Sequence, residues 1–455
     1  MTNNRLSVGV IGGGLLGMTL SLRLAESGLD VTLIESSEDT GGTAGSCAMG
    51  DYRWDRFYHV ILLSDSHLLS LLEELGLKDR LNWGVTKTGY YADGKLYTIS
   101  NLIEYLLFPP LNILDKFRLG WTIFYGSRIK NWKRLEKVTS ADWLKRHSGR
   151  ATFDKLWLPL LKSKLGADYG LASASFIWAH ISRLYAARRT GLKKEMFGYV
   201  SGGYRTIIDA LQRSLDDRGV KTLGRTRIHQ LKDEGARVTT ETGKSESRHF
   251  DKVVLTIPCT RILELCPQLS EQETVRLKSV VHQNLLCAAL ILKKPLSECY
   301  VTNIADGDIP FTGIIEMTTL VDKANFGGHS LVYLPRYLKK GDPLFQKNDE
   351  AIKEIFLSSL MNLYPDLGSE DLVASCISRI VDFPVIPTLD YYEKSLPPSA
   401  TSMRNVFIVN SAQIPNGTNN VNEIVGLANR KAADLTSFFD DAEKLRASFT
   451  ISSGT

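Results

Sequence analysis

Six residues near the N-terminus and one carboxylate further on carry the clearest chemical signal in the sequence. The motif Gly12-Gly13-Gly14-Leu15-Leu16-Gly17 lies between an apolar run and a helical pattern, and Glu35 comes 23 residues after Gly12. We interpret Gly12 as allowing a tight turn, Gly14 as letting the backbone approach a pyrophosphate, and Gly17 as allowing close packing of a helix on a strand. Backbone N–H groups at the helix start would meet phosphate charge, and Glu35 would accept hydrogen bonds from a ribose.

Hydrophobic residues around this motif follow the periods of a strand, a helix and a second strand. Residues 6–11 alternate like a short buried strand, whereas Leu16, Leu20 and Leu24 repeat every four residues, as on one face of a helix that ends at Gly28. Residues 31–34 form a second, largely apolar run. This order predicts a Rossmann βαβ unit, which turns a weak glycine motif into a strong indication of nucleotide binding.

A second glycine cluster decides between the dinucleotides. Ser36 and four further residues separate Glu35 from Gly41-Gly42-Thr43. A glycine-rich turn, a Glu, five residues and a Gly-Gly pair resemble the signature of the flavoprotein superfamily that includes amine oxidases, protoporphyrinogen oxidases, phytoene desaturases and UDP-galactopyranose mutases. The resemblance implies FAD as the cofactor, with the second glycine pair beneath its diphosphate.

The resemblance extends along most of the chain. Residues 198–203 precede a helix, as in the family's return to the FAD domain, and residues 250–258 resemble the strand that closes this domain. Ile228 matches the position whose backbone meets the adenine, and residues 405–432 resemble the last strand, loop and helix, which approach the flavin ring. The motif and the resemblance together imply cofactor contacts at Gly12, Gly14, Leu15, Leu16, Gly17, Glu35, Ser36, Gly41, Gly42, Thr43, Phe57, Tyr58, Ile228, Thr256, Asn420 and Val421.

Two departures from the family pattern alter the expected contacts. Thr43 stands where the family has Arg or Lys after the glycine pair, which removes a cation from the cofactor site. Asn410-Ser411 replaces a Gly-Asp or Gly-Glu pair, which removes a carboxylate. The C-terminal flavin loop contains no cysteine, so we expect the FAD to be bound non-covalently.

The segment Trp54–His59 follows the second glycine cluster and, by the resemblance, passes the flavin ring. His59 is the candidate catalytic residue, because a histidine with a near-neutral pKa can transfer a proton or hydrogen-bond the flavin. A histidine with a purely structural role is the alternative. Phe57 and Tyr58 are candidate walls for the ring. Flavin carries hydride chemistry itself, so we expect no catalytic triad, and no second G-x-G-x-x-G motif indicates an NAD(P)H domain.

Positive charge is concentrated in the middle of the chain. Residues 101–200 contain 18 Lys and Arg against 7 Asp and Glu, a local charge of +11, whereas the rest of the chain carries −6. Three interpretations are open: a solvated helical face, contact with an anionic substrate, or peripheral membrane contact through residues 103–137, where aromatic residues stand beside cations. The cations that could bind a substrate phosphate or pyrophosphate are Lys162, Lys164, Arg183, Arg188 and Arg189.

Composition argues against several other classes of protein. Apolar residues make up 43% and charged residues 23%, the balance of a globular protein. The longest apolar runs are too short to span a bilayer and the first residues lack the core of a signal peptide, so we expect a cytoplasmic protein, with peripheral contact at the inner membrane face left open. The six cysteines are scattered and the eight histidines show no ligand spacing, so no metal site is expected. Nucleic acid is not an expected partner.

These observations predict an α/β fold in which a discontinuous, Rossmann-like FAD-binding domain is joined to a substrate domain that mixes sheet and helix. We expect FAD-binding segments at residues 1–85, 196–280 and 401–440. A helical substrate or cap region should occupy residues 86–195, a substrate-domain sheet 281–400 and a tail 441–455. Residues 66–200 should be mainly helical.

The predicted function is FAD-dependent oxidation or dehydrogenation of a small organic substrate by hydride transfer to flavin, as in amine oxidases and desaturases. The substrate could be phosphate-bearing or prenyl-like. One alternative is a redox-neutral, FAD-dependent isomerase of the UDP-galactopyranose mutase type that acts on a nucleotide-sugar or another anionic substrate. A second alternative is a flavoprotein that keeps its cofactor without catalysis. The sequence does not indicate the oligomeric state or the electron acceptor.

Overall fold

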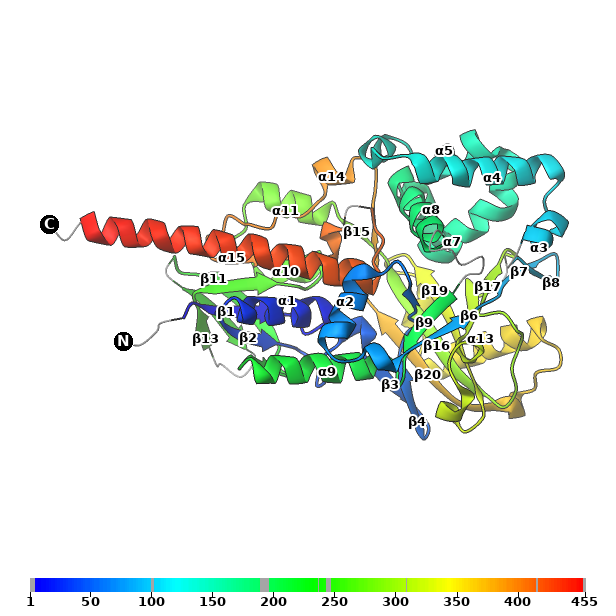
Figure 1. Cartoon of the computed structure of the whole chain (residues 1–455), viewed down its shortest axis with the longest axis horizontal. Coiled ribbons are helices and arrows are strands. Elements are labelled where there is room, and N and C mark those ends of the chain that lie inside the picture. Colours follow the sequence, from blue (N-terminus) through cyan, green and yellow to red (C-terminus); the bar gives the residue numbers. More distant parts are fainter. Residues whose placement is uncertain are drawn as a thin grey trace.

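The computed structural model describes residues 5–99, 102–188, 196–235, 237–242, 247–307, 309–414 and 416–452. Two β-sheets form its framework and lie at opposite ends of the molecule (Figure 1). Long helices run along one side of the first sheet, whereas a cluster of helices forms a cap above the second sheet. The mixed α/β fold that the sequence predicts is therefore confirmed.

The first sheet is parallel and has the strand order β10-β2-β1-β14-β22. This is the order of a doubly wound nucleotide-binding sheet, in which ligands bind beyond the carboxyl ends of the strands where the order reverses. That point lies between β1 and β14, directly before Gly12 and Thr256. The strands are β1 (Ser7–Ile11), β2 (Asp30–Ile34), β10 (Lys221–Leu223), β14 (Lys252–Leu255) and β22 (Val406–Ile408).

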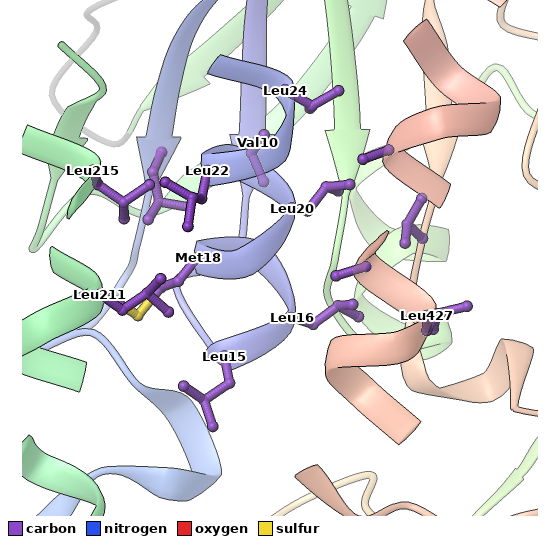
Figure 2. Packing of buried hydrophobic residues seen from close by; sticks show 14 of the residues in the cluster. Val10, Leu15, Leu16, Met18, Leu20, Leu22, Leu24, Leu211, Leu215 and Leu427 are labelled. Atoms are coloured by element: carbon purple, nitrogen blue, oxygen red, sulfur yellow. The ribbon is translucent and has the colours of Figure 1, made fainter. Parts of the chain in front are cut away.

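Helix α1 (Leu15–Glu26) packs between two other helices on one face of this sheet (Figure 2). Leu16 and Leu20 point toward α15 (Val421–Ser452), and Met18 and Leu22 point toward α9 (Tyr204–Asp217). Apolar residues therefore occupy two sides of α1, and all of those named here are at most 6% exposed. Helix α2 (Ser66–Glu74) completes this layer against α15.

Antiparallel strands and a short helix cover the opposite face of the parallel sheet. Phe250, Leu231 and Ile262 meet buried residues of β1, β2 and β14 there, including Ile11 and Ile34. The covering elements are β11 (Ile228–Asp233), β12 (Val238–Thr242), β13 (Ser247–Phe250) and α10 (Cys259–Leu265), followed by α11 (Glu271–Lys278).

The second sheet has seven strands in the order β20-β16-β19-β18-β17-β7-β8. All nine residues of β16 are buried, because α13 (Asp349–Leu363) covers one face of the sheet and the hairpin β3 (Ser46–Met49)–β4 (Tyr52–Asp55) approaches the other. The strands are β7 (Thr88–Ala92), β8 (Lys95–Thr98), β16 (Asn284–Leu292), β17 (Val301–Ile304), β18 (Gly313–Glu316), β19 (Ser330–Leu338) and β20 (Leu372–Ile380).

The expectation of a mainly helical stretch from residue 66 to residue 200 is wrong for residues 81–98. This segment forms β6 (Leu81–Val85), β7 and β8, and β7 pairs in parallel with β17 of the second sheet. The turn between β7 and β8 is Asp93-Gly94, with φ of 53° and 69°. An Asp-Gly pair with positive φ at both residues is the preferred turn of a tight hairpin, so the sequence contained a signal for this hairpin.

The helical cap has its own apolar core, which includes Trp143, Leu144, Phe153 and Leu161. Its helices are α3 (Leu102–Leu107), α4 (Ile113–Arg128), α5 (Ser140–Ser148), α6 (Arg150–Thr152), α7 (Leu158–Leu165) and α8 (Ala174–Arg188). The smaller elements elsewhere are β5 (Ile61–Leu62), β9 (Met196–Val200), β15 (Val281–His282), β21 (Val385–Ile386), α12 (Pro343–Gln346) and α14 (Tyr391–Lys394).

Helix α15 continues to Ser452, past the end at Phe439 that the hydrophobic pattern predicts. Residues 453–455 of the predicted tail lie outside the described residues, as does Arg189 of the basic block. Within the described part of the chain, no helix combines the length and the apolar character needed to cross a bilayer.

Candidate functional site

The first glycine motif forms the tight turn between β1 and α1. Gly12 has φ of 115° and donates its N–H to the carbonyl oxygen of Ile34 at 2.9 Å. The Thr256 hydroxyl donates to the carbonyl oxygens of Ile11 and Gly12 at 3.0 and 2.9 Å, so the end of β14 fixes this turn. A Cβ on Gly17 would lie 1.9 Å from the carbonyl oxygen of Gly12, which leaves no room for a side chain.

The second glycine cluster rests on the first. The Gly41 N–H donates to the carbonyl oxygen of Gly13 at 2.7 Å, and Gly41 and Gly42 have φ of 108° and 56°. A Cβ on Gly14 would have only Gly42 Cα within 4 Å, at 4.0 Å, so this face of the backbone is open. No side chain caps α1. The two loops thus form a cradle of backbone at the start of α1, where helix N–H groups lack intrahelical partners.

Glu35 holds this cradle through both carboxylate oxygens. Its Oε2 accepts a hydrogen bond from the Gly13 N–H at 2.7 Å, and its Oε1 accepts from the Ser37 N–H at 2.7 Å and from the Ser36 hydroxyl at 3.1 Å. The carbonyl oxygen of Glu35 accepts from the Thr226 N–H at 2.8 Å, which brings the start of β11 at Ile228 to the same end of the sheet. Glu35 therefore shapes the loop, whereas its contact with a ribose stays a prediction.

The other residues near the cradle that were predicted to contact the cofactor differ in which of their atoms are accessible. Leu15 and Leu16 are each 6% exposed and pack in the core, so only their backbone could meet a phosphate. Thr43 lies in the turn Gly42–Ala44. Arg56 donates its N–H to the carbonyl oxygen of Gly45 at 3.0 Å, and its Nε is buried without a partner. Arg56, whose backbone bonds to the same loop, is a cation that the sequence pattern did not indicate.

The start of α15 brings further polar groups to this region. The Asn420 side chain accepts a hydrogen bond from the Glu423 N–H at 3.1 Å, while Asn422 accepts from the N–H groups of His67 and Leu68 at 2.9 and 3.2 Å. Both polar side-chain atoms of Asn419 are buried without partners. The Asn410 side chain donates its Nδ2 to the Ile257 carbonyl oxygen at 3.0 Å and so supports the backbone. Ser411, which stands where the family has its carboxylate, begins the short turn Ser411–Gln413.

A cavity of about 230 Å³ lies between the cap and the loop that precedes α15. The buried carboxylate of Asp65 and the guanidinium of Arg183 pair there at 3.0 Å. Other lining residues include Ser64, Trp178, Asn416 and Glu423. Arg183, a cation of the predicted basic block, therefore points inward but already has a carboxylate partner.

His59 lies against the first turn of α9. Its ring is 4.6 Å from the ring of Tyr204, and its Nδ1 is 2.9 Å from the carbonyl oxygen of Phe57, to which it donates. Burial lowers the pKa of His59 to about 4, so the ring is neutral near pH 7 and presents Nε2 as an acceptor. The Tyr204 hydroxyl is buried without a partner, and no pattern in the sequence indicated this residue.

Phe57 and Tyr58 point to different neighbours. Phe57 is 4% exposed and packs in the core beneath the second sheet. The Tyr58 hydroxyl lies 3.0 Å from Nζ of Lys164 on α7 and 3.3 Å from the hydroxyl of Tyr337 on β19. Tyr58 therefore joins the segment that follows β4 to the cap and to the second sheet.

These residues fit a dinucleotide, because the cradle consists of backbone with one open face and the surrounding residues have buried polar groups without hydrogen-bond partners. Arg56 Nε, the Tyr204 hydroxyl and the Asn419 amide are buried without partners, although buried polar groups are normally satisfied. Arg56 could meet a phosphate, and the start of α15 could meet the polar edge of a flavin. Among the described residues, no cluster of His, Cys, Asp and Glu could hold a metal ion.

A parallel sheet with this order and cradle defines a dinucleotide-binding flavoprotein fold. The sequence model of the flavin-containing amine oxidoreductases matches residues 17–416, and the chain belongs to this family. The resemblance and the flavin cofactor inferred from the sequence are thereby confirmed, as is the assignment to an FAD-dependent oxidoreductase family.

Individual relatives are distant. Protoporphyrinogen oxidase 2 of Arabidopsis thaliana is 23% identical over 57% of this chain and 58% of its own length, so the match spans little more than half of that relative. A putative protoporphyrinogen oxidase from Exiguobacterium has the same fold, with a TM-score of 0.76 and 16% identity over 96% of this chain and 99% of that one. A fatty acid isomerase from P. acnes shares the fold at a TM-score of 0.71, with 14% identity over 95% and 99% of the two chains.

Proposed function

We propose that the protein is an FAD-dependent oxidoreductase that removes a hydride from a small organic substrate at the junction of its two sheets. The observation that supports this most directly is the backbone cradle of Gly12, Gly14, Gly41 and Gly42 at the topological switch point, in a chain that belongs to a flavin-dependent family. Bound FAD supplies the hydride acceptor. The protein's own groups orient the reactants and hold protons.

In this proposal, His59 orients the flavin or the substrate by accepting a hydrogen bond from it. Because Nδ1 donates to the Phe57 carbonyl oxygen, Nε2 remains to accept a hydrogen bond from the flavin or the substrate. A pKa of about 4 makes the neutral ring a weak base at pH 7, which favours orientation over proton transfer.

Replacement of His59 tests this role. His59→Ala should keep FAD but lower turnover by roughly 10²–10⁴-fold, the usual loss for one positioned catalytic group. His59→Gln keeps an amide acceptor without titrating, so it should recover much of the rate. The measurement is the rate of flavin reduction under single-turnover conditions. Equal losses in the two variants would assign proton transfer to His59, and unchanged rates in both would leave it a structural histidine.

The reaction type is tested on the purified protein. Mass spectrometry after denaturation should detect FAD, and a true substrate should bleach the flavin absorbance under anaerobic conditions. The panel would include protoporphyrinogen and unsaturated fatty acids, which are the compound classes in the names of the similar proteins. Absence of FAD after reconstitution would refute the proposal.

A redox-neutral isomerase is the second candidate, because one protein of this fold is a fatty acid isomerase. In the isomerase proposal, the flavin returns to its starting state after each turnover, so substrate would cause no lasting bleaching. Activity that requires prior reduction of the flavin would favour the isomerase of the UDP-galactopyranose mutase type. Bleaching without such a requirement would favour the oxidoreductase.

We also propose that the cap touches the anionic surface of a membrane through α3, α4 and the segment after them. Large apolar side chains are exposed here by 40% to 75%, and α3 and α4 lie at the outer edge of the cap, away from the parallel sheet (Figure 1). Those on α4 recur at helical spacing and so form one stripe. The exposed apolar residues are Leu106, Leu107, Ile113, Leu114, Phe117, Trp121, Phe124 and Tyr125.

Charge on this face supports a lipid surface as the partner. The two acidic residues between positions 105 and 137, Asp115 and Glu136, are only 2% and 3% exposed. Five cations around the stripe are exposed, and Arg128 lies 4.9 Å from the ring centre of Phe124. Glu104 on α3 is partly exposed, so on this face the exposed cations outnumber the acidic residues, as an anionic bilayer interface favours. The exposed cations are Arg118, Arg128, Lys130, Lys133 and Arg134.

A further inference from the structure

Lys164 is a half-buried cation that lacks an anionic partner. It is the next-to-last residue of α7, and its Nζ donates to the Tyr58 hydroxyl at 3.0 Å. Within the described ranges of the chain, no carboxylate pairs with this ammonium group. An ammonium group that is partly removed from water without a counter-charge is unfavourable, so a ligand anion would stabilise it.

The position of Lys164 is fixed by close packing of the end of α7 on the second sheet. Gly166 has φ of 53°, and a Cβ there would lie 2.5 Å from the carbonyl oxygen of Tyr337. The fully buried Gln283 donates its Nε2 to the carbonyl oxygen of Leu165 at 2.6 Å. Lys164 is therefore held beside Tyr337 by contacts at Leu165 and Gly166, the two residues that follow it.

Polar groups around Lys164 form a set that is incomplete without a ligand. The ammonium group has further N–H bonds to donate after Tyr58, and the Tyr58 and Tyr337 hydroxyls lie 3.3 Å apart. Burial raises the pKa of Tyr58 to about 12, so its hydroxyl remains a donor at pH 7.

Other cations of the basic block are less suited to hold an anion. Arg183 pairs with Asp65, and Lys162 is exposed on α7 beside the ring of Tyr169. Lys164 and Arg183 both help to lower the pKa of His180, after burial as the main cause, so both cations lie near this histidine. Of the two, Lys164 is the cation without a carboxylate partner among the described residues.

We propose that Lys164, with the Tyr58 hydroxyl, binds an oxyanion of the substrate, either a carboxylate or a phosphate. This inference rests on the proposed oxidoreductase function and adds a substrate class to it. Lys164 is a specificity residue in this role, because it anchors the anionic end of the substrate.

The test is anion binding to the FAD-loaded protein by isothermal titration calorimetry, with acetate and inorganic phosphate as probes in separate titrations. The wild type should bind one of them, and the one bound more tightly identifies the oxyanion. Lys164→Met should weaken that binding at least about 10-fold, as expected on loss of a charge-assisted hydrogen bond. Lys164→Arg should largely restore binding. Lys162→Met, the same change two residues earlier on the same helix, is the matched control and should bind as the wild type does.

Several outcomes would overturn the inference. These are failure of the wild type to bind either anion, equal affinities in Lys164→Met and Lys162→Met, and loss of FAD from Lys164→Met, which would place Lys164 at the cofactor instead. Flavin content, measured by absorbance in every variant, separates this failure from failure of the proposed function, because a wild type without FAD would refute the latter alone.

Discussion

Gly17→Ala is expected to abolish cofactor binding. Alanine in a helix interior normally stabilises by about 1 kcal/mol relative to glycine. At Gly17, however, the new Cβ would lie 1.9 Å from the carbonyl oxygen of Gly12 and 2.9 Å from the Thr256 hydroxyl oxygen. The start of α1 must therefore move away from the turn, and the backbone cradle is lost with it. Flavin absorbance per protein, after reconstitution with excess FAD, measures the effect.

Gly120→Ala is the control for this substitution. Gly120 also lies within a helix, α4, but a Cβ there meets nothing within 4 Å. This variant should retain the flavin content of the wild type and unfold at the same or a slightly higher temperature. A Gly17→Ala protein with normal flavin content would show that α1 can shift without harm to the site, and that cofactor binding does not depend on the cradle.

The double variant Phe117→Glu/Trp121→Glu is expected to lose binding to vesicles that contain anionic lipid. These side chains are 73% and 52% exposed in the middle of the α4 stripe, so the change should leave the fold intact while it places two charges at the interface. Sedimentation with anionic and with neutral vesicles gives the bound fraction, and we expect a decrease of more than 10-fold. High salt should weaken binding of the wild type, because the Debye length falls from about 10 Å at 0.1 M to about 3 Å at 1 M.

Val275→Glu provides the matched control for the membrane proposal. Val275 is 61% exposed on α11, outside the cap, so its replacement adds a charge at a similarly exposed apolar position without touching the stripe. This variant should bind vesicles like the wild type. If the wild type does not bind but forms a dimer that the double variant lacks, the stripe is an interface between two copies of the chain.

Local patterns in the sequence predicted the parts of the fold that are built from neighbouring residues. The strand, glycine turn and helix around Gly12 and the position of Glu35 needed only hydrophobic period and turn chemistry, and the structure has both. The Asp93-Gly94 turn was an equally clear local signal for a hairpin, but it was missed because the segments around it were predicted to be helical. The strand pairing of β7 with β17 joins residues more than 200 positions apart and has no local signal.

The candidate site also combines residues that local sequence patterns indicated with residues that only the folded chain brings together. Gly12, Gly14, Gly17, Gly41, Gly42 and Thr256 meet around the start of α1, yet their roles at the cofactor remain predictions. Contacts among Tyr58, Lys164 and Tyr337 depend on three chain segments that come together only in the folded protein. Lys164 was one of many cations in the sequence. Its lack of a carboxylate partner is a property of the packing, which distinguishes it from Lys162.

The strand order of the parallel sheet has a consequence for biosynthesis. β14 lies between β1, which leaves the ribosome first, and β22, which is made only after residue 405. Until then, one edge of β14 has no partner and α1 lacks its cover from α15, so nascent chains expose an unpaired strand and an apolar helix face. FAD loading must therefore follow synthesis of β22 and α15. A product truncated before β22 should be found with chaperones or proteases and without flavin.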